Sequence, residues 1–120
     1  MDNINGVNRY ECTALHSALH FNEFDLIKLL IENGCNINIQ NNDNFTALHL
    51  ALQLKLDVSI IELILENGAD CTLSSIYNTT LNYAIEYNNL MVVKLILTKL
   101  LNNGGMVVTI RSRKQQLLME

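Results

Sequence analysis

The sequence repeats itself with a period of 33 residues. Thr13-Ala14-Leu15-His16 recurs as Thr46-Ala47-Leu48-His49 and, in altered form, as Thr79-Thr80-Leu81-Asn82. A fixed period of about 20 to 50 residues is typical of solenoids, in which each unit packs only against its neighbours. This feature therefore predicts a stack of similar units.

A second block recurs later in each unit. Residues 26–34 (LIKLLIENG) match residues 60–68 (IIELILENG) at a spacing of 34 residues. The extra residue lies between Ala51 and Ile60, and the next connection is one residue shorter, so the period is restored. In the third unit the apolar run from residue 90 continues towards Gly104, which predicts a longer helix. Each unit is expected to hold two helices.

Local signals mark where these helices begin and end. Thr13, Thr46 and Thr79 stand where a hydroxyl group can cap the first helix of each unit. Gly34 and Gly68 follow an asparagine at the end of the second helix, where a left-handed residue closes the last turn. The polar segments 38–44 and 72–78 between the units predict exposed loops.

These motifs resemble those of the ankyrin repeat family, with its T-P-L-H-x-A signature. The match is carried by residues 13–18, 46–51 and a degenerate third copy, together with Glu-Asn-Gly-Ala-Asp at 66–70. The resemblance covers about residues 2–105. It implies an all-α fold, an ankyrin solenoid of about three helix-turn-helix units with hairpin-like finger loops. The expected boundaries are a remnant of a preceding finger at 1–7, repeats at 8–40, 41–73 and 74–105 (degenerate), and a C-terminal tail at 106–120.

The sequence departs from the family pattern at several positions. The glycine of the finger is replaced by Glu11, Asn44 and Tyr77, and the motif histidine by Asn82 in the third copy. Asparagine tolerates a left-handed backbone, so we expect looser fingers at Glu11 and Tyr77. The resemblance also implies that the motif histidines make structural hydrogen bonds between units, and His16 and His49 match that position.

Both ends of the sequence suggest an array cut from a longer one. Shifting residues 35–38 back by 33 gives residues 2–5, so the chain opens inside a finger whose helices are absent. Residues 106–120 contain no fourth motif. Because stacked repeats need ends that shield the core, we expect residues 107–110 to cover the last unit.

Charge and hydropathy exclude several classes of protein. The formal net charge is −4, and residues 1–110 hold five basic and eleven acidic side chains, which disfavours nucleic acid as a partner. No segment approaches the roughly 18 to 20 apolar residues of a membrane span, and the polar start is unlike a secretory signal.

The spacing of Cys12, Cys35 and Cys71 fits neither a disulfide framework nor a metal knuckle. We expect a reduced, intracellular protein.

Candidate catalytic and metal sites are weak. His16 and His20 are four residues apart, as in an HExxH zinc motif, but Ser17 replaces the glutamate and no third histidine is near. Cys12 or Cys35 with a histidine would lack a third, orienting group. We therefore expect no enzyme activity, no metal and no cofactor. The basic segment 111–114 is interpreted as a solvated tail, with a localisation or phosphate-contacting patch as the alternative.

A surface for protein recognition remains. In ankyrin arrays, the concave face is built from the finger tips and the exposed side of each first helix. On this chain, equivalent late positions of the first helices form an apolar ladder of Phe21, Leu54 and Tyr87. Beside the ladder run His20, Gln53 and Glu86, and the fingers contribute Arg9, Tyr10, Asn42, Asp43, Phe45, Ser75, Ile76 and Asn78. Apolar anchors with a polar rim are typical of binding hot spots. The alternative is that the ladder packs against neighbouring fingers and extends the core.

The frequent asparagine and isoleucine indicate an AT-rich coding genome. The sequences of residues 56–63 and 66–70 resemble those of ankyrin proteins of poxviruses and other large DNA viruses. The resemblance implies a monomeric, non-enzymatic interaction module that binds a host protein in the cytoplasm or nucleus, in host range or immune evasion. Many such proteins carry an F-box-like C-terminal segment, for which residues 106–120 are too short. One alternative is an inhibitor-of-NF-κB-like protein that sequesters a transcription factor. Another is a decayed fragment without function of its own.

Overall fold

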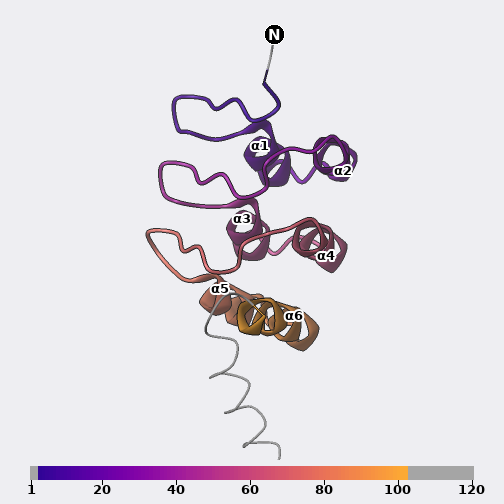
Figure 1. Ribbon diagram of the computed structural model, residues 1–120, viewed down its shortest axis with the longest axis vertical. Helices are drawn as coiled ribbons and strands as arrows, with labels where there is room; N and C mark the ends of the chain where they lie inside the picture. The colour runs from indigo at the N-terminus through magenta and orange to yellow at the C-terminus, as the bar shows by residue number, and fades with distance from the viewer. Residues whose placement is uncertain (1–2, 103–120) are drawn as a thin grey trace, which may run out of the picture.

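Six helices form three stacked pairs in the computed structural model, which describes residues 3–102 (Figure 1). They are α1 (Ala14–His20), α2 (Phe24–Glu32), α3 (Ala47–Gln53), α4 (Val58–Glu66), α5 (Thr80–Tyr87) and α6 (Leu90–Leu101). The predicted all-α solenoid of helix pairs is confirmed, and α6 is longer than α2 and α4, at 12 residues against nine. The predicted tail at 106–120, with its covering segment at 107–110 and basic segment at 111–114, lies outside the described residues.

Each first helix begins at a threonine cap. The Thr13 hydroxyl oxygen accepts from the backbone N–H of His16 at 3.3 Å, and the His16 ring accepts from the N–H of Thr13 at 2.9 Å. Thr46 and His49 repeat this reciprocal capping box before α3. Thr79 caps α5 through the N–H of Asn82 at 3.2 Å. Such caps satisfy backbone donors that have no partner inside the helix.

The helices end on left-handed residues. Gly34 (φ 80°) and Gly68 (φ 95°) follow α2 and α4, as their positions predict. After Gly34, the N–H of Cys35 returns to the carbonyl of Leu30 at 3.2 Å, which completes a Schellman motif. The first helices turn instead on non-glycine residues with φ between 54° and 63°, namely Asn22, Lys55 and Asn88.

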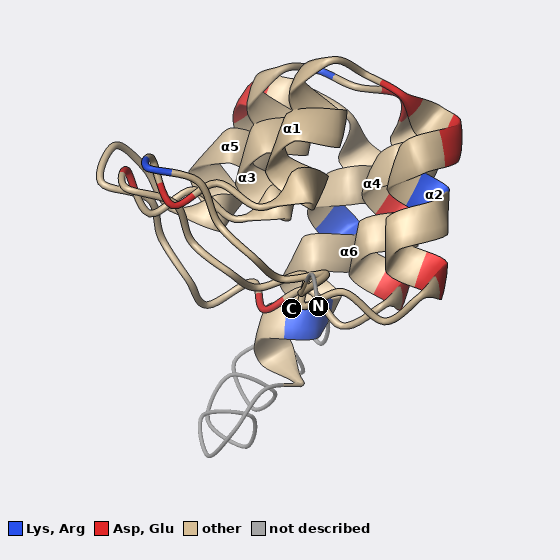
Figure 2. Ribbon diagram, turned by 90° about the horizontal axis from the view of Figure 1, so that it is seen from above, with Lys and Arg blue, Asp and Glu red and all other residues tan. Residues whose placement is uncertain are grey.

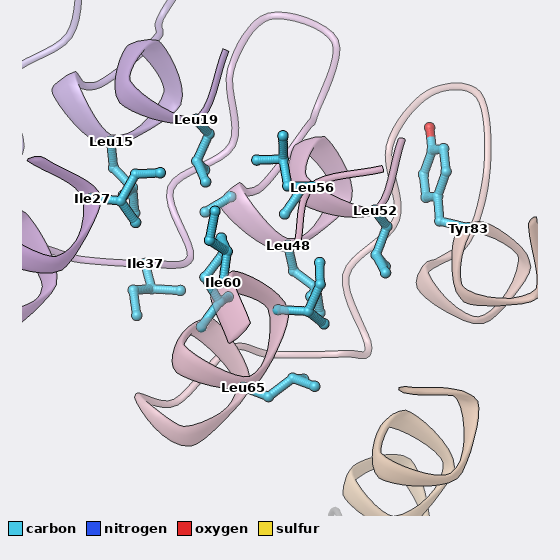
Figure 3. Close-up of a cluster of buried hydrophobic side chains, with 14 of the residues drawn as sticks. Leu15, Leu19, Ile27, Ile37, Leu48, Leu52, Leu56, Ile60, Leu65 and Tyr83 are labelled. Atoms are coloured by element: carbon cyan, nitrogen blue, oxygen red, sulfur yellow. The ribbon is translucent and has the colours of Figure 1, made fainter. Parts of the chain in front are cut away.

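The hydrophobic core lies between the two layers of helices and continues from repeat to repeat (Figure 3). Helix α3 packs against both α1 and α5, and α4 packs against both α2 and α6. Equivalent side chains therefore stack along the array: Leu19 of α1 and Leu52 of α3 are both buried, as are Ile27 of α2 and Ile61 of α4. Burial of these stacked aliphatic side chains is the main force that holds the repeats together.

The finger loops are joined by backbone hydrogen bonds and lie side by side (Figure 1). The N–H of Asn42 donates to the carbonyl of Tyr10, and the N–H of Ile76 donates to that of Asp43, each at 3.0 Å. Glu11 adopts the left-handed conformation at φ 60° despite its side chain, as Asn44 does at φ 61°. Left-handed backbone therefore occurs in the first two fingers without glycine.

The third finger is built differently, because Tyr77 is not left-handed. The Ser75 hydroxyl oxygen accepts from the N–H groups of Tyr77 and Asn78, each at 3.1 Å. The same hydroxyl lies 2.7 Å from the hydroxyl of Tyr83 on α5. Ser75 thus joins the finger to the helix that follows it.

Residues 3–7 continue the pattern of the array at its first end. The side-chain oxygen of Asn5 accepts from the N–H of Asn36 at 2.6 Å. One repeat further on, the side-chain oxygen of Asn38 accepts from the N–H of Asp70 at 2.8 Å. Asn5 therefore makes the contact that Asn38 makes one repeat later.

Candidate functional site

The candidate site is the face between the finger loops and the first helices α1, α3 and α5 (Figures 1 and 2). Hydrogen bonds from the motif histidines His16 and His49 hold the repeats that form this face at a fixed spacing. The Nε2 atom of His16 donates to the Phe45 carbonyl at 2.9 Å, since its Nδ1 atom accepts from Thr13. The Nε2 atom of His49 lies 3.0 Å from the Leu73 carbonyl and 2.8 Å from the hydroxyl of Thr80, which belongs to the third repeat. Each histidine therefore bridges two repeats.

Burial lowers the pKa of both motif histidines below the usual value for the residue, and backbone carbonyls oppose part of that shift. A neutral ring is what the geometry requires, because protonation would place a second hydrogen opposite the Thr13 N–H. These histidines hold the fold and are not free to act on a ligand.

The predicted apolar ladder is exposed at two of its three positions. Phe21 is 71% exposed and Leu54 is 39% exposed. Tyr87 is half-buried, packs on the core, and its hydroxyl donates to the Leu56 carbonyl of the preceding repeat at 2.5 Å. Only Phe21 and Leu54 therefore present large apolar surfaces to a partner.

The predicted polar neighbours of the ladder are exposed. The ring of His20 meets that of Phe21 edge to face, with 5.2 Å between centroids. Gln53 and Glu86 lie on the surface beside the later rungs, and Lys55 donates to the Glu86 backbone carbonyl at 2.8 Å.

Most of the predicted finger residues are also accessible. Arg9, Tyr10, Asn42, Asp43 and Ile76 are exposed, and Asn78 is half-buried. The Arg9 guanidinium lies 4.9 Å from the centre of the Tyr10 ring. Such a pair can offer a partner both an aromatic surface and a charge.

Two finger residues are corrected by the structure, because their side chains are buried. Phe45 is 6% exposed and packs its ring on those of His49 and Tyr83. Ser75 is 9% exposed, with its hydroxyl engaged by the third finger. The expectation that these side chains face a partner is wrong, because Phe45 packs against Tyr83 of the next repeat and Ser75 is bonded to Tyr83 of its own repeat.

A groove of about 210 Å³ opens on this face. Its lining residues come from repeats 1 and 2: Asn8, Cys12, His16, Ser17, His20, Phe21, Asn41 and Leu50. Ser17 and Leu50 were missed, although they lie 33 residues apart and one helical turn before Phe21 and Leu54. Tyr77, which is 68% exposed on the third finger, was missed as well.

The groove can accept one large side chain. Phe21 and Leu50 supply apolar walls, while Ser17 and Asn41 supply polar groups that can orient a backbone or a polar tip. This combination of apolar wall and polar rim suits recognition of a peptide or a protein loop.

Among residues 3–102, no three His, Cys, Asp or Glu side chains are grouped so as to hold a metal ion. Burial raises the pKa of the Cys71 thiol to about 11, so this buried thiol stays protonated. Within the described part of the chain, none of the helices has the length and apolar character needed to cross a membrane.

Comparisons with known proteins identify the family. A family profile for ankyrin repeats (3 copies) matches residues 1–75. Ankyrin repeat protein FPV222 of fowlpox virus is 34% identical over 105 residues, which cover 88% of this chain and 13% of that protein. Ankyrin repeat protein 14 of vaccinia virus is 27% identical over 78 residues, covering 63% of this chain and 33% of that protein.

The same repeats match a plant protein. E3 ubiquitin-protein ligase KEG of Arabidopsis thaliana is 39% identical over 61 residues, covering 51% of this chain and 4% of that protein. The chain thus spans at most a third of each of these three relatives. With its three stacked helix pairs, its threonine caps and its bridging histidines, the chain belongs to the ankyrin repeat family, whose repeats form protein–protein interaction modules.

Proposed function

We propose that this chain is a non-enzymatic module that binds a host intracellular protein through its concave face. The observation that carries the proposal is the groove beside Phe21, with an exposed Phe21 and Leu54 along the first helices. Exposed apolar side chains that lie beside a groove often mark an interaction site. The similarity to poxvirus ankyrin proteins supports a role in host range or immune evasion, exercised in the host cytoplasm.

Charge favours protein over nucleic acid as the partner. Residues 3–102 hold five basic and ten acidic side chains, a net charge of −5. Glu11, Asp43 and Glu86 stand on or beside the concave face. Phosphate groups would be repelled from such a surface.

The test compares two matched double variants in host cells. Phe21→Ala/Leu54→Ala removes a phenylalanine and a leucine from the concave face. Phe24→Ala/Leu29→Ala removes the same residue types from α2 on the opposite side, where these side chains are 42% and 57% exposed. Tyr87 is left intact, because its hydroxyl bond to Leu56 makes it part of the fold.

Each variant is first checked for helical content by circular dichroism and then used to capture host proteins by affinity purification. We expect a host protein to be recovered with the wild type and with the α2 variant. With the concave-face variant, the recovered amount of that protein should be at least tenfold lower. Equal recovery with both variants would refute binding through this face. Loss with the α2 variant alone would place the site on the convex side.

A further inference from the structure

A second groove opens between α4 and α6, which lie with α2 on the side of the molecule away from the finger loops (Figure 2). Its volume is about 300 Å³. A larger hollow of about 520 Å³ shares Leu65 and Lys99 with it, so the groove is open at that end. An open-ended groove suits a segment of a partner better than a single side chain. The groove is lined by Glu62, Leu65, Glu66, Met91, Leu95 and Lys99.

Each wall of this groove is one face of a helix. Met91, Leu95 and Lys99 follow one another every four residues on α6. Glu62 and Glu66 are likewise four residues apart on α4. Side chains at this spacing lie one above the other on a helix. The α6 wall therefore runs for about 12 Å, which is about two helical turns.

Two residues distinguish the α6 wall from the second helices of the first two repeats. Met91 stands two residues after the cap of α6, where the earlier repeats have the polar residues Asp25 and Ser59. It is 46% exposed, and methionine adapts its shape to varied apolar partners. Lys99 lies on the part of α6 that extends beyond the nine residues of α2 and α4. The third repeat thus adds an apolar side chain at one end of the groove and a cation at the other.

The groove combines an apolar floor with an acidic wall. Leu65 is 2% exposed, Leu95 is half-buried, and Glu62 and Glu66 are half-buried and exposed. Within residues 3–102, neither carboxylate is paired with a lysine or an arginine. Unpaired carboxylates beside an apolar strip are complementary to a segment that carries positive charge next to apolar side chains.

We propose that this groove binds an amphipathic helix of a second protein partner, with apolar side chains along one face and lysine or arginine beside them. Its apolar face packs on Leu65, Met91 and Leu95. Its basic side chains face Glu62 and Glu66. Helices that lie in apolar grooves use anchors three, four and seven residues apart, which two turns supply. This inference goes beyond the concave-face proposal and does not rest on it, because the chain can hold one partner on each side.

The test uses the full chain and two synthetic helical peptides that differ only in charge. Both peptides carry leucines along one face and a hydrocarbon staple on the opposite face. One has lysines beside the leucines, and the other has glutamates at the same places. Fluorescence anisotropy measures the dissociation constant of each peptide. We expect the lysine peptide to bind about tenfold more tightly, because attraction to two carboxylates becomes repulsion in the glutamate peptide.

Reversal of the acidic wall should reverse this preference. With Glu62→Lys/Glu66→Lys, we expect the glutamate peptide to bind more tightly than the lysine peptide. Asp25→Lys/Glu32→Lys makes the same change in net charge on α2, outside the groove, and should retain the preference for the lysine peptide. Equal effects of the two double variants would overturn the proposal, since net charge alone would then account for binding.

Two adjacent residues of α6 test the apolar contact. Met91→Ser installs the residue type that Ser59 provides in the second repeat, and it should weaken binding of the lysine peptide about tenfold. Leu90→Ser removes an apolar side chain that is 70% exposed and does not line the groove, so it should change binding by less than about twofold. Circular dichroism first confirms that each variant is helical. Equal losses with the two variants would contradict the assigned groove.

Equal or undetectable binding of the two peptides to the wild type would overturn the proposal. Another occupant of the groove, such as residues 103–120 or a second copy, would then be favoured. Sedimentation velocity identifies the second copy: a sedimentation coefficient that rises with protein concentration, and no longer rises with Met91→Ser, would assign the groove to self-association instead. A coefficient that stays constant supports a separate protein as the partner.

Discussion

Some side chains of this protein hold neighbouring repeats together, and others are exposed on the surface where a partner can bind. His16 and His49 each make a capping bond within one repeat and also contact a polar group of the next, the Phe45 carbonyl for His16 and the Thr80 hydroxyl for His49. One side chain thus joins local structure to stacking. Phe21 and Leu54 make no comparable bond and leave much of their apolar surface in water. Substitutions at Phe21 and Leu54 are therefore expected to disturb the fold less than substitutions at the two histidines.

The motif histidines predict acid sensitivity. Burial depresses their pKa in the folded state below the unfolded value of 6.5, so below that pH the unfolded chain binds more protons. The free energy of unfolding should therefore be constant above pH 7 and fall as the pH drops from about 6.5 through the folded pKa. Urea denaturation between pH 5 and 7.5 measures this slope, and His49→Asn should reduce it. A flat profile across this range would contradict the neutral, bridging histidines.

At the scale of elements, the fingers show how one loop shape is reached in two ways. The first two fingers use left-handed Glu11 and Asn44, together with side-chain bonds from Asn8 and Asn41 to backbone N–H groups. The third finger has Ser74 where those asparagines stand, and Ser75 supplies the bonds instead. The third finger therefore stays folded although its motif is degenerate, because the Ser75 hydroxyl replaces the asparagine side-chain oxygen as the hydrogen-bond acceptor.

Removal of that hydroxyl should be costly. Ser75→Ala leaves two backbone N–H groups and the buried Tyr83 hydroxyl without this partner. We expect the free energy of unfolding to fall by about 1–3 kcal/mol, the usual cost of unsatisfied buried polar groups. Thermal denaturation of Ser75→Ala, Tyr83→Phe and the double variant measures it. If the pair is coupled, the double variant should be less destabilised than the sum of the two single ones.

At the scale of the whole molecule, stability comes from contacts between neighbouring repeats. The second repeat is the only one of the three helix pairs in residues 3–102 that has another pair on both sides (Figure 1). Its side chains, such as Ile61 and Ile64, are fully buried. Loss of packing there is expected to weaken both interfaces at once.

Ile61→Ala tests this dependence. We expect it to cost about 2–5 kcal/mol, because the cavity lies in a closed part of the core. Hydrogen exchange should accelerate in α1 and α5 as well as in α4. Leu29→Ala, at a side chain 57% exposed on α2, should cost no more than about 0.5 kcal/mol. Loss of protection confined to α4 would show that the repeats unfold independently.

The sequence by itself determined the architecture and the local structure of each repeat. The 33-residue period predicted the solenoid, and Thr13, Thr46, Gly34 and Gly68 predicted helix ends, because caps depend on residues a few positions apart. The tertiary structure decided which side chains are available. Phe45 on a finger and Tyr87 at the end of α5 looked like surface anchors, but the Tyr83 ring of the next repeat covers Phe45 and the Leu56 carbonyl of the preceding repeat holds the hydroxyl of the half-buried Tyr87. Their burial depends on residues about 30 to 40 positions away in the sequence, and a periodic pattern does not encode how those side chains fit together. The repeat spacing was sufficient to predict that Phe21 and Leu54 are exposed on the open face.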